Sequence, residues 1–128
     1  EEEVIRRIRF PVPRAGRGVY RKLGLRKGTS CAVASVAVWL IEEGGKVSDI
    51  RIAFGGVAPT ARRAPQTEAG FRGQRLEAAA VARLAEAAAA EISPISDVRG
   101  SAEYRRRVAV RLLAQAVRTA AGLEARED

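Results

Sequence analysis

The chain has 128 residues, of which 47% are hydrophobic, and a formal net charge of +8. A chain of this length forms one domain with a single core of moderate size. It contains no histidine and one cysteine. Within this chain, that composition excludes a Ser-His-Asp triad, an imidazole base, an intramolecular disulfide and a CxxC redox pair.

The composition also predicts where the protein works. No apolar run approaches the roughly 18 residues of a membrane span, and the acidic first residues do not form a secretory signal. Cys31 lies in an apolar run, which predicts a small buried hydrophobe in a reducing, cytoplasmic protein. Because the sequence lacks methionine, either its start was removed or residues 1–128 are a piece of a longer protein.

The first half of the chain predicts strands. Val4, Ile8 and Phe10 share one side of a first strand, which Pro11 and Pro13 end. The Gly- and Arg-rich residues 14–29 predict a loop. A strand over 30–41 is apolar on both sides, which favours coverage of both faces or a partner. Two glycines then predict a hairpin turn over 42–46, and a return strand over 47–54 with Ile50, Ile52 and Phe54 inward.

The second half predicts helices. A short helix over 65–71 is stopped by Gly73. A long alanine-rich helix follows over 74–92, with an apolar stripe at Leu76, Ala80, Leu84, Ala88 and Ile92. Ser101 predicts the N-cap of the last helix, whose core stripe is Tyr104, Val108, Leu112 and Ala116 and whose solvated side carries Arg107, Arg111 and Arg118.

Strands followed by helices predict an α+β fold, in which a small antiparallel sheet of about three strands carries about three helices on one face. The 23 basic residues do not change that reading. Twenty of them are arginines, spread over nearly every segment rather than gathered into one stripe. Aromatic residues make up 5% of the chain. This distribution argues against nucleic acid as the biological partner.

Three segments carry more specific information. They are YRKLGLR at Tyr20–Arg26, FGGVAPTARRA at Phe54–Ala64, and DVRGSAEYRR at Asp97–Arg106. In this order and spacing they resemble the C-terminal domain of the FAD-containing medium subunit of molybdenum hydroxylases. That family includes bacterial carbon monoxide dehydrogenase and xanthine dehydrogenase. The resemblance covers nearly the whole chain, from Glu3 to about Gly122.

The resemblance implies a role in a larger oxidoreductase. In these enzymes a molybdenum cofactor on a large subunit oxidises the substrate, and electrons cross two [2Fe-2S] clusters on a small subunit to FAD on the medium subunit. FAD passes them to an external acceptor. The chain would follow the N-terminal FAD-binding domain, which is absent here, and pack beside the flavin and the partner subunits. By itself the domain is not expected to be catalytic.

The resemblance also implies two cofactor-binding residues, Lys22 and Arg26. A lysine in the matching segment of the family approaches the flavin, and a cation there would stabilise the reduced, anionic ring. The alternative is that both are solvated charges on a loop. Tyr20 could pack against the partner domain or only locally.

Two further groups suit structural roles better than chemistry. Gly55 and Gly56 lack the GxGxxG spacing of a phosphate loop, so we interpret them as a sharp turn after the hairpin. Asp97, Arg99, Glu103 and Arg105 surround a helix start and predict an ion-pair cluster that pins it. A second function stays open at this point, namely a stand-alone basic binding module with the same fold and no cofactor.

Overall fold

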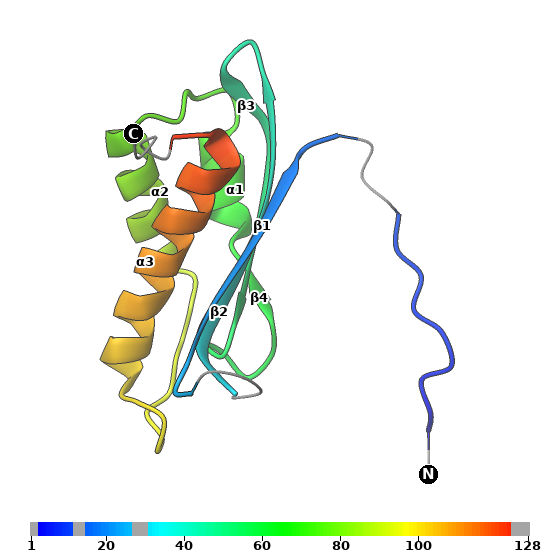
Figure 1. Cartoon of the computed structure of the whole chain (residues 1–128), viewed down its shortest axis with the longest axis vertical. Coiled ribbons are helices and arrows are strands. Elements are labelled where there is room, and N and C mark those ends of the chain that lie inside the picture. Colours follow the sequence, from blue (N-terminus) through cyan, green and yellow to red (C-terminus); the bar gives the residue numbers. More distant parts are fainter. Residues whose placement is uncertain (1–2, 12–14, 27–30, 124–128) are drawn as a thin grey trace.

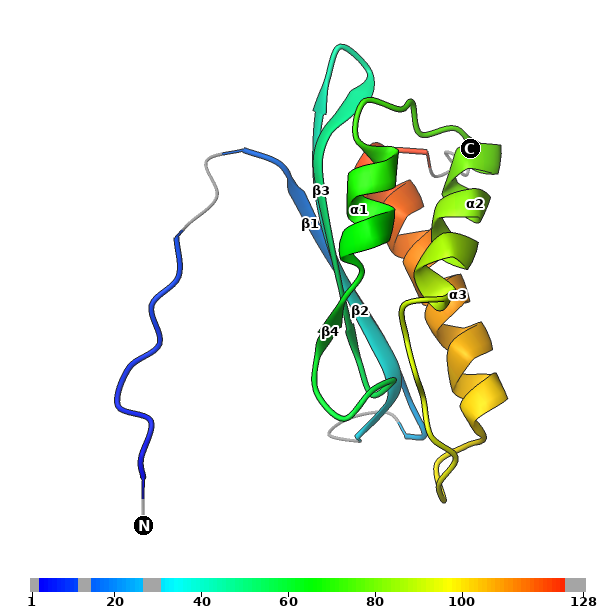
Figure 2. The ribbon, with the colours of Figure 1, turned by 180° about the vertical axis from the view of Figure 1, so that it is seen from behind.

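The computed structural model describes residues 3–11, 15–26 and 31–123. These form an antiparallel sheet in the order β1-β2-β3-β4 with three helices on one face (Figures 1 and 2), as the α+β prediction states. The strands are β1 (Arg17–Gly24), β2 (Ala32–Glu43), β3 (Lys46–Gly55) and the two-residue β4 (Arg62–Arg63). The helices are α1 (Pro65–Phe71), α2 (Ala78–Ala89) and α3 (Ala102–Ala121).

The central hairpin forms as predicted. Glu43 pairs with Lys46, and the two residues between them, Gly44 and Gly45, have φ angles of 58° and 72°. Glycine adopts this left-handed conformation without the penalty that a Cβ atom brings. The turn closes the hairpin, and an irregularity between Ile41 and Glu42 then shifts the register by one residue. In the resulting register Ile50, Ile52 and Phe54 of β3 are buried in the core.

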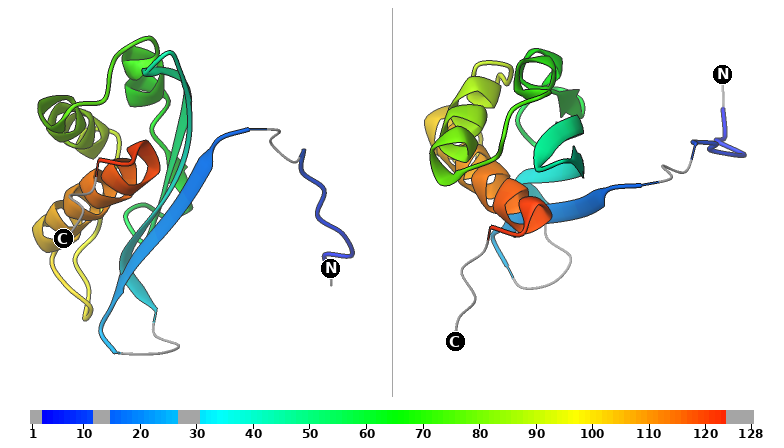
Figure 3. Two further views of the ribbon diagram at one scale, coloured as in Figure 1. Left: turned by 45° about the horizontal axis from the view of Figure 1, so that its top comes forward. Right: turned by 90° about the horizontal axis from the view of Figure 1, so that it is seen from above.

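The two faces of the sheet have different surroundings. On the inner face of β2, Val36, Val38 and Leu40 are buried beneath the helices. On the outer face, Ala37 is exposed and Trp39 is half-buried. The helices cover the inner face alone (Figure 3), so the two-sided apolar pattern of β2 corresponds to one covered face and one that the described residues leave open.

The first predicted strand is wrong. Residues 3–11 form no strand, and their apolar side chains, including Ile8 and Phe10, are at least 75% exposed. The first strand is instead β1, inside the stretch predicted as a loop. Strand formation depends on a partner with matching register. Every residue of β1 pairs with β2, whereas no described strand pairs with residues 3–11. The predicted ends at Pro13 and Ser30 fall outside the described residues.

The two shorter helices follow the prediction with one change. α1 has the predicted bounds, and Gly73 beyond it has a φ of 79°. α2 begins at Ala78 rather than at residue 74 and ends at Ala89 rather than at Ile92. The start is delayed because Gly73 donates its N–H to the carbonyl of Val47 at 2.7 Å, and the carbonyl of Gln74 accepts from Val47 N–H at 2.9 Å. The predicted apolar stripe is nevertheless buried throughout, Leu76 and Ile92 included.

The last helix starts as predicted but faces the core differently. The Ser101 hydroxyl accepts a hydrogen bond from Tyr104 N–H at 3.1 Å, which confirms the N-cap. Tyr104, predicted in the core, is 40% exposed, and Leu112 is only half-buried. Arg105 takes the buried position of the first turn, and the core stripe continues through Val108, Ala109, Leu113, Ala116, Val117 and Ala120. The three arginines predicted to be solvated, Arg107, Arg111 and Arg118, are all exposed, as predicted.

Two local features complete the fold. Cys31 is exposed just before β2, so the prediction of a buried cysteine is wrong, because the strand that buries its neighbours begins one residue later. Gly56 has a φ of 74°, and a Cβ atom there would lie 3.1 Å from the carbonyl oxygen of Val33. This confirms a tight turn after β3. None of the described helices is both long and apolar enough to span a membrane.

Candidate functional site

The open outer face of the sheet is a shallow groove of about 570 Å³. Strand register places Tyr20, Ala37, Ala53 and Arg63 in one row across all four strands. The neighbouring row consists of Gly18, Trp39 and Arg51. We call these seven residues the outer groove. Its floor is made of small side chains, so the groove offers a flat apolar surface bordered by aromatic and cationic groups.

Trp39 borders the groove because the facing strand has glycines. A Cβ atom on Gly18 would lie 3.0 Å from the indole ring, and one on Gly16 would lie 2.6 Å from its Nε1 atom. These two glycines therefore leave the space that the ring occupies. The indole N–H is buried and has no hydrogen-bond partner among the described residues. The prediction of a featureless glycine-rich loop gave no sign of this arrangement.

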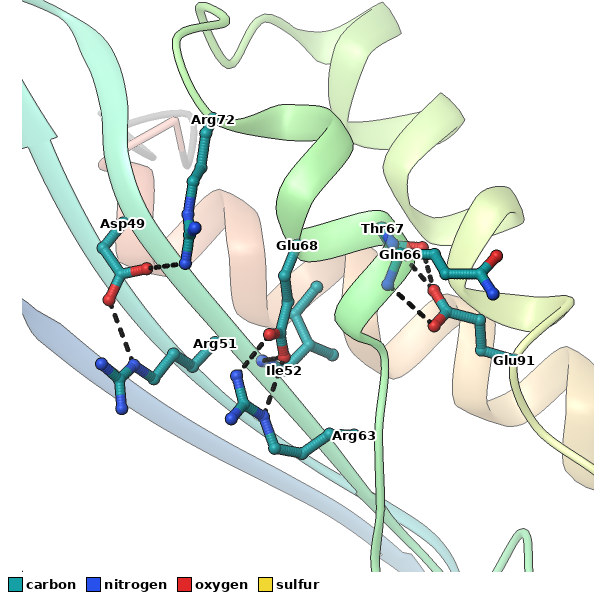
Figure 4. A network of polar contacts seen from close by, with 9 residues as sticks. All are labelled: Asp49, Arg51, Ile52, Arg63, Gln66, Thr67, Glu68, Arg72 and Glu91. Carbon is teal, nitrogen blue, oxygen red and sulfur yellow. Dashed lines mark hydrogen bonds and ion pairs between the residues drawn. The ribbon is translucent and has the colours of Figure 1, made fainter.

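The two arginines of the outer groove are each held by a carboxylate (Figure 4). Arg51 donates from Nε to Asp49 at 3.1 Å, and Asp49 also accepts from Arg72 at 2.9 Å. Burial raises the pKa of Asp49, but the hydrogen bonds from Arg51 and Arg72 outweigh it and hold that pKa below its ordinary value. The Arg51 guanidinium is thus oriented from one side while its side chain stays 62% exposed.

Arg63 is held by the buried Glu68 of α1. Its Nε lies 3.2 Å from Glu68 Oε1, and its Nη2 contacts Oε2. The same Oε1 accepts the buried backbone N–H of Ile52 at 2.8 Å. Glu68 therefore joins α1 to β3 and at the same time directs Arg63, whose side chain is 54% exposed, at the edge of the groove. The sequence did not predict a role for Glu68, because a glutamate on a helix is ordinarily exposed.

Of the two predicted cofactor-binding residues, Lys22 lies on this face and Arg26 lies outside the sheet. Lys22 is inside β1, opposite Ser35, in the row next to Tyr20. Arg26 follows two residues after β1 ends and is exposed. The prediction of a loop around Lys22 is therefore wrong, and its exposed side chain projects from a hydrogen-bonded strand.

The surroundings of Lys22 suit a planar anionic ring. Its row continues through Ser35 to Gly55, where a Cβ atom would lie only 2.6 Å from the Ser35 hydroxyl. The missing side chain keeps this part of the face flat. A flat surface with a cation at one edge and Tyr20 beside it matches the shape and the charge of a reduced flavin ring. No cluster of metal-ligating side chains occurs in the described ranges.

The predicted ion-pair cluster forms a buried clamp below this face. Arg105 is 3% exposed and donates from Nη1 to the carbonyls of Val33 at 3.0 Å and Gly56 at 2.8 Å. Its Nη2 contacts Asp97. Arg99 donates its backbone N–H to Asp97 at 2.8 Å and also pairs through its side chain. Glu103 lies outside the cluster and pairs with Arg107.

This clamp changes the acidity of Asp97. The backbone hydrogen bond from Arg99 lowers the pKa of Asp97 from 3.8 to about 2, helped by the side chains of Arg99 and Arg105. Arg105 in turn fixes the start of β2 to the turn after β3. The predicted cluster is therefore confirmed for Asp97, Arg99 and Arg105 and wrong for Glu103. It holds the end of the strand that carries Ser35 and the groove floor.

A second cavity, of about 830 Å³, lies between α1 and α2. Glu91 at its edge accepts the backbone N–H groups of Gln66 at 3.0 Å and Thr67 at 2.8 Å, together with the Thr67 hydroxyl at 2.7 Å. Burial raises the pKa of Glu91, but these hydrogen bonds reverse the effect and lower it overall. Both carboxylate oxygens are thus committed to the start of α1, which indicates a structural role.

Comparison with known proteins gives one consistent result. The family model of the CO dehydrogenase flavoprotein C-terminal domain matches residues 19–120. The chain is 36% identical to the glyceraldehyde dehydrogenase medium chain of Sulfolobus acidocaldarius, over 83% of this chain and 37% of that protein. It is 38% identical to the carbon monoxide dehydrogenase medium chain of Hydrogenophaga pseudoflava, over 94% of this chain and 42% of that protein.

The solved structures agree. Reconstituted CO dehydrogenase from Oligotropha carboxidovorans superposes with a TM-score of 0.81 at 35% identity, covering 88% of this chain and 39% of that one. The chain therefore spans about two fifths of the length of the relatives it matches.

Proposed function

Because the chain belongs to the family of CO dehydrogenase flavoprotein C-terminal domains, we propose that it is the C-terminal domain of the FAD-binding medium subunit of a molybdenum-dependent hydroxylase or dehydrogenase. In this role it packs beside the flavin and supports electron transfer from [2Fe-2S] clusters through FAD to an external acceptor. The preceding FAD-binding domain of the same polypeptide, an iron–sulfur small subunit and a molybdenum large subunit are its partners, in the cytoplasm.

The observation that carries this proposal is the placement of Lys22. It lies on the open face of a sheet whose other face is closed by the helices. Lys22 lies beside the outer groove and does not line it, so a ring at Lys22 needs a second surface to enclose it. The medium chains that resemble this protein are more than twice its length, which is consistent with a second domain that supplies that surface.

The role of Lys22 follows from its charge. When bound, FAD supplies two-electron and one-electron redox chemistry, and reduction adds negative charge to its ring. The Lys22 ammonium favours that charge by an amount that depends on distance and solvent screening. The strand carrying Lys22 is anchored to β2 over its whole length, so the ammonium group is presented from a rigid element. Arg26, outside the sheet, is proposed to contact the cofactor at its periphery.

The test is a flavin potential measured in the full-length subunit. Lys22→Gln is expected to lower the flavin midpoint potential and leave the fold intact, because an exposed strand residue contributes little to the core. Lys46→Gln, in the β2–β3 hairpin, is the matched control and should leave the potential unchanged. An unchanged potential together with unchanged FAD affinity in Lys22→Gln would remove Lys22 from the site. A full-length subunit that binds no flavin would refute the proposed function itself.

A further inference from the structure

The outer groove is open within the described residues, although its composition is that of a contact surface. Its floor is apolar, with Gly18, Ala37 and Ala53 on three neighbouring strands. Tyr20, at the β1 end of the row, is 63% exposed. A flat apolar floor rimmed by polar groups is characteristic of surfaces that another chain segment covers.

The rim has a definite electrostatic character. The Nε atoms of Arg51 and Arg63 donate to Asp49 and Glu68 respectively, and Arg63 also uses Nη2. Each guanidinium is thereby oriented by a carboxylate and keeps further N–H groups for a second acceptor. Arginine presents these donors as a planar fork that matches a carboxylate. Asp49 and Glu68 therefore orient two exposed guanidinium groups on neighbouring strands.

The charge of the rim indicates which kind of polypeptide can cover the outer groove. A second copy of this chain would bring another net charge of +8 to the groove, and the N-terminal segment over 3–11 would bring Arg6, Arg7 and Arg9. Both would face Arg51 and Arg63 with like charge, which opposes binding. An occupant with carboxylates suits the rim, and one with apolar groups between them suits the floor.

The course of the chain indicates where that occupant comes from. Residues 3–11 lie on the side of the sheet opposite to the helices (Figures 1 and 3). The chain therefore enters the domain from the side of the outer groove. In the relatives, more than half of the polypeptide lies outside the region that this chain matches.

We propose that the outer groove seats an acidic, partly apolar surface of the polypeptide that precedes this domain in the same subunit. Carboxylates of that surface pair with Arg51 and Arg63, while an apolar group lies on Ala37 and Ala53. This inference rests on the proposed function, because it takes the chain as the C-terminal part of a longer subunit. It adds the surface of contact and the chemistry of the contacting partner.

The experiment uses the 128-residue chain and the preceding part of its own subunit, produced as two separate polypeptides. Their dissociation constant is measured by calorimetry at low and at high salt. The double variant R51A/R63A is expected to raise the dissociation constant about tenfold and to flatten its salt dependence. Ala37→Glu, which places a carboxylate on the groove floor, is expected to weaken binding at least as much. Arg83→Ala and Arg111→Ala, exposed on the helical side, are the controls and should bind as wild type.

Thermal melting of each variant establishes that the chain is folded. Wild-type affinity in both R51A/R63A and Ala37→Glu would overturn the proposal. The proposal would also be overturned if the variants lost binding to the iron–sulfur subunit and kept their binding to the preceding polypeptide. Flavin content of the full-length subunit separates the two levels of inference. If the full-length subunit holds flavin and the variants bind normally, the proposed function stands and the docking surface alone is refuted. If it holds no flavin, the proposed function is refuted, and the docking surface, which rests on it, falls with it.

Discussion

Removal of the Arg105 guanidinium is expected to destabilise the domain more than any other single loss of charge. Arg105→Met keeps the aliphatic stem, so the change isolates the hydrogen bonds from the packing. The variant leaves the carbonyl of Val33, a residue with no exposed surface, without its donor. It also removes the donor from the carbonyl of Gly56, where the backbone is exposed and water can replace it.

The magnitude follows from these two carbonyls. A buried acceptor that loses its partner costs about 1–3 kcal/mol, and a hydrogen bond to a charged donor is worth about 1.5–3 kcal/mol. Asp97 keeps its ion pair with Arg99 and its contact with water, so the loss of its contact with Arg105 adds little to the cost. The Nε atom of Arg105 is buried without a partner among the described residues, and removing it recovers part of the cost. We expect a net loss of about 3 kcal/mol in the free energy of unfolding.

Differential scanning calorimetry of the chain checks this value. For a domain of this size about 3 kcal/mol lowers Tm by roughly 10 °C. Arg107→Met, two residues along α3 and 64% exposed, is the matched control and should change the stability by less than about 0.5 kcal/mol. Arg105→Lys should fall between the two, because one ammonium group cannot serve two carbonyls and Asp97 together. A melting temperature for Arg105→Met equal to that of the control would refute the buried clamp.

Three further outcomes are expected. Because the pKa of Asp97 is lower in the folded state, the unfolded state binds more protons between about pH 4 and pH 2. The free energy of unfolding should therefore decrease as the pH is lowered from about 4 to about 2, and it should decrease less steeply in Asp97→Asn. An acid titration of unfolding measures both slopes. Glu68→Ala should cost about 2–3 kcal/mol by removing the acceptor of the buried Ile52 N–H, whereas Glu68→Gln should cost less because its amide oxygen can still accept, a difference that urea denaturation resolves. The isolated chain should purify without flavin absorbance, and stoichiometric FAD in the purified chain would contradict the assignment of most flavin contacts to the preceding domain.

The elements with local signals could be predicted from the sequence. Gly44 and Gly45 determine the central hairpin through backbone conformation alone, and Pro65 and Gly73 delimit α1 through the missing N–H and the positive φ. Ser101 caps α3 through a hydrogen bond that spans three residues. In each case the physical cause lies within a few residues of its effect.

The elements that depend on distant partners could not be predicted in this way. The strand β1 carries arginine at positions 17 and 21 on its inner side, where Arg21 reaches Thr119 of α3 at 3.0 Å. An apolar pattern therefore does not mark it, whereas the apolar alternation over 3–11 marks a strand that these residues do not form. Likewise, Arg105 is buried because it meets carbonyls 72 and 49 residues away. Neither acceptor is visible from the sequence around Arg105.

The arrangement of charge connects these structural details with the open face. On the helical side, two arginines satisfy groups inside the domain: Arg105 donates to two carbonyls, and Arg106 donates to the carbonyls of Ala89 and Ile92 at the end of α2. On the outer side, Arg51 and Arg63 use only part of their donor capacity on Asp49 and Glu68. Because exposed arginines occur on both sides of the domain, they do not form one stripe that could track phosphates. The remaining donors of Arg51 and Arg63 lie at the outer groove, in the same sheet face as Lys22, which is where a second surface has to meet this domain for the flavin proposal to hold.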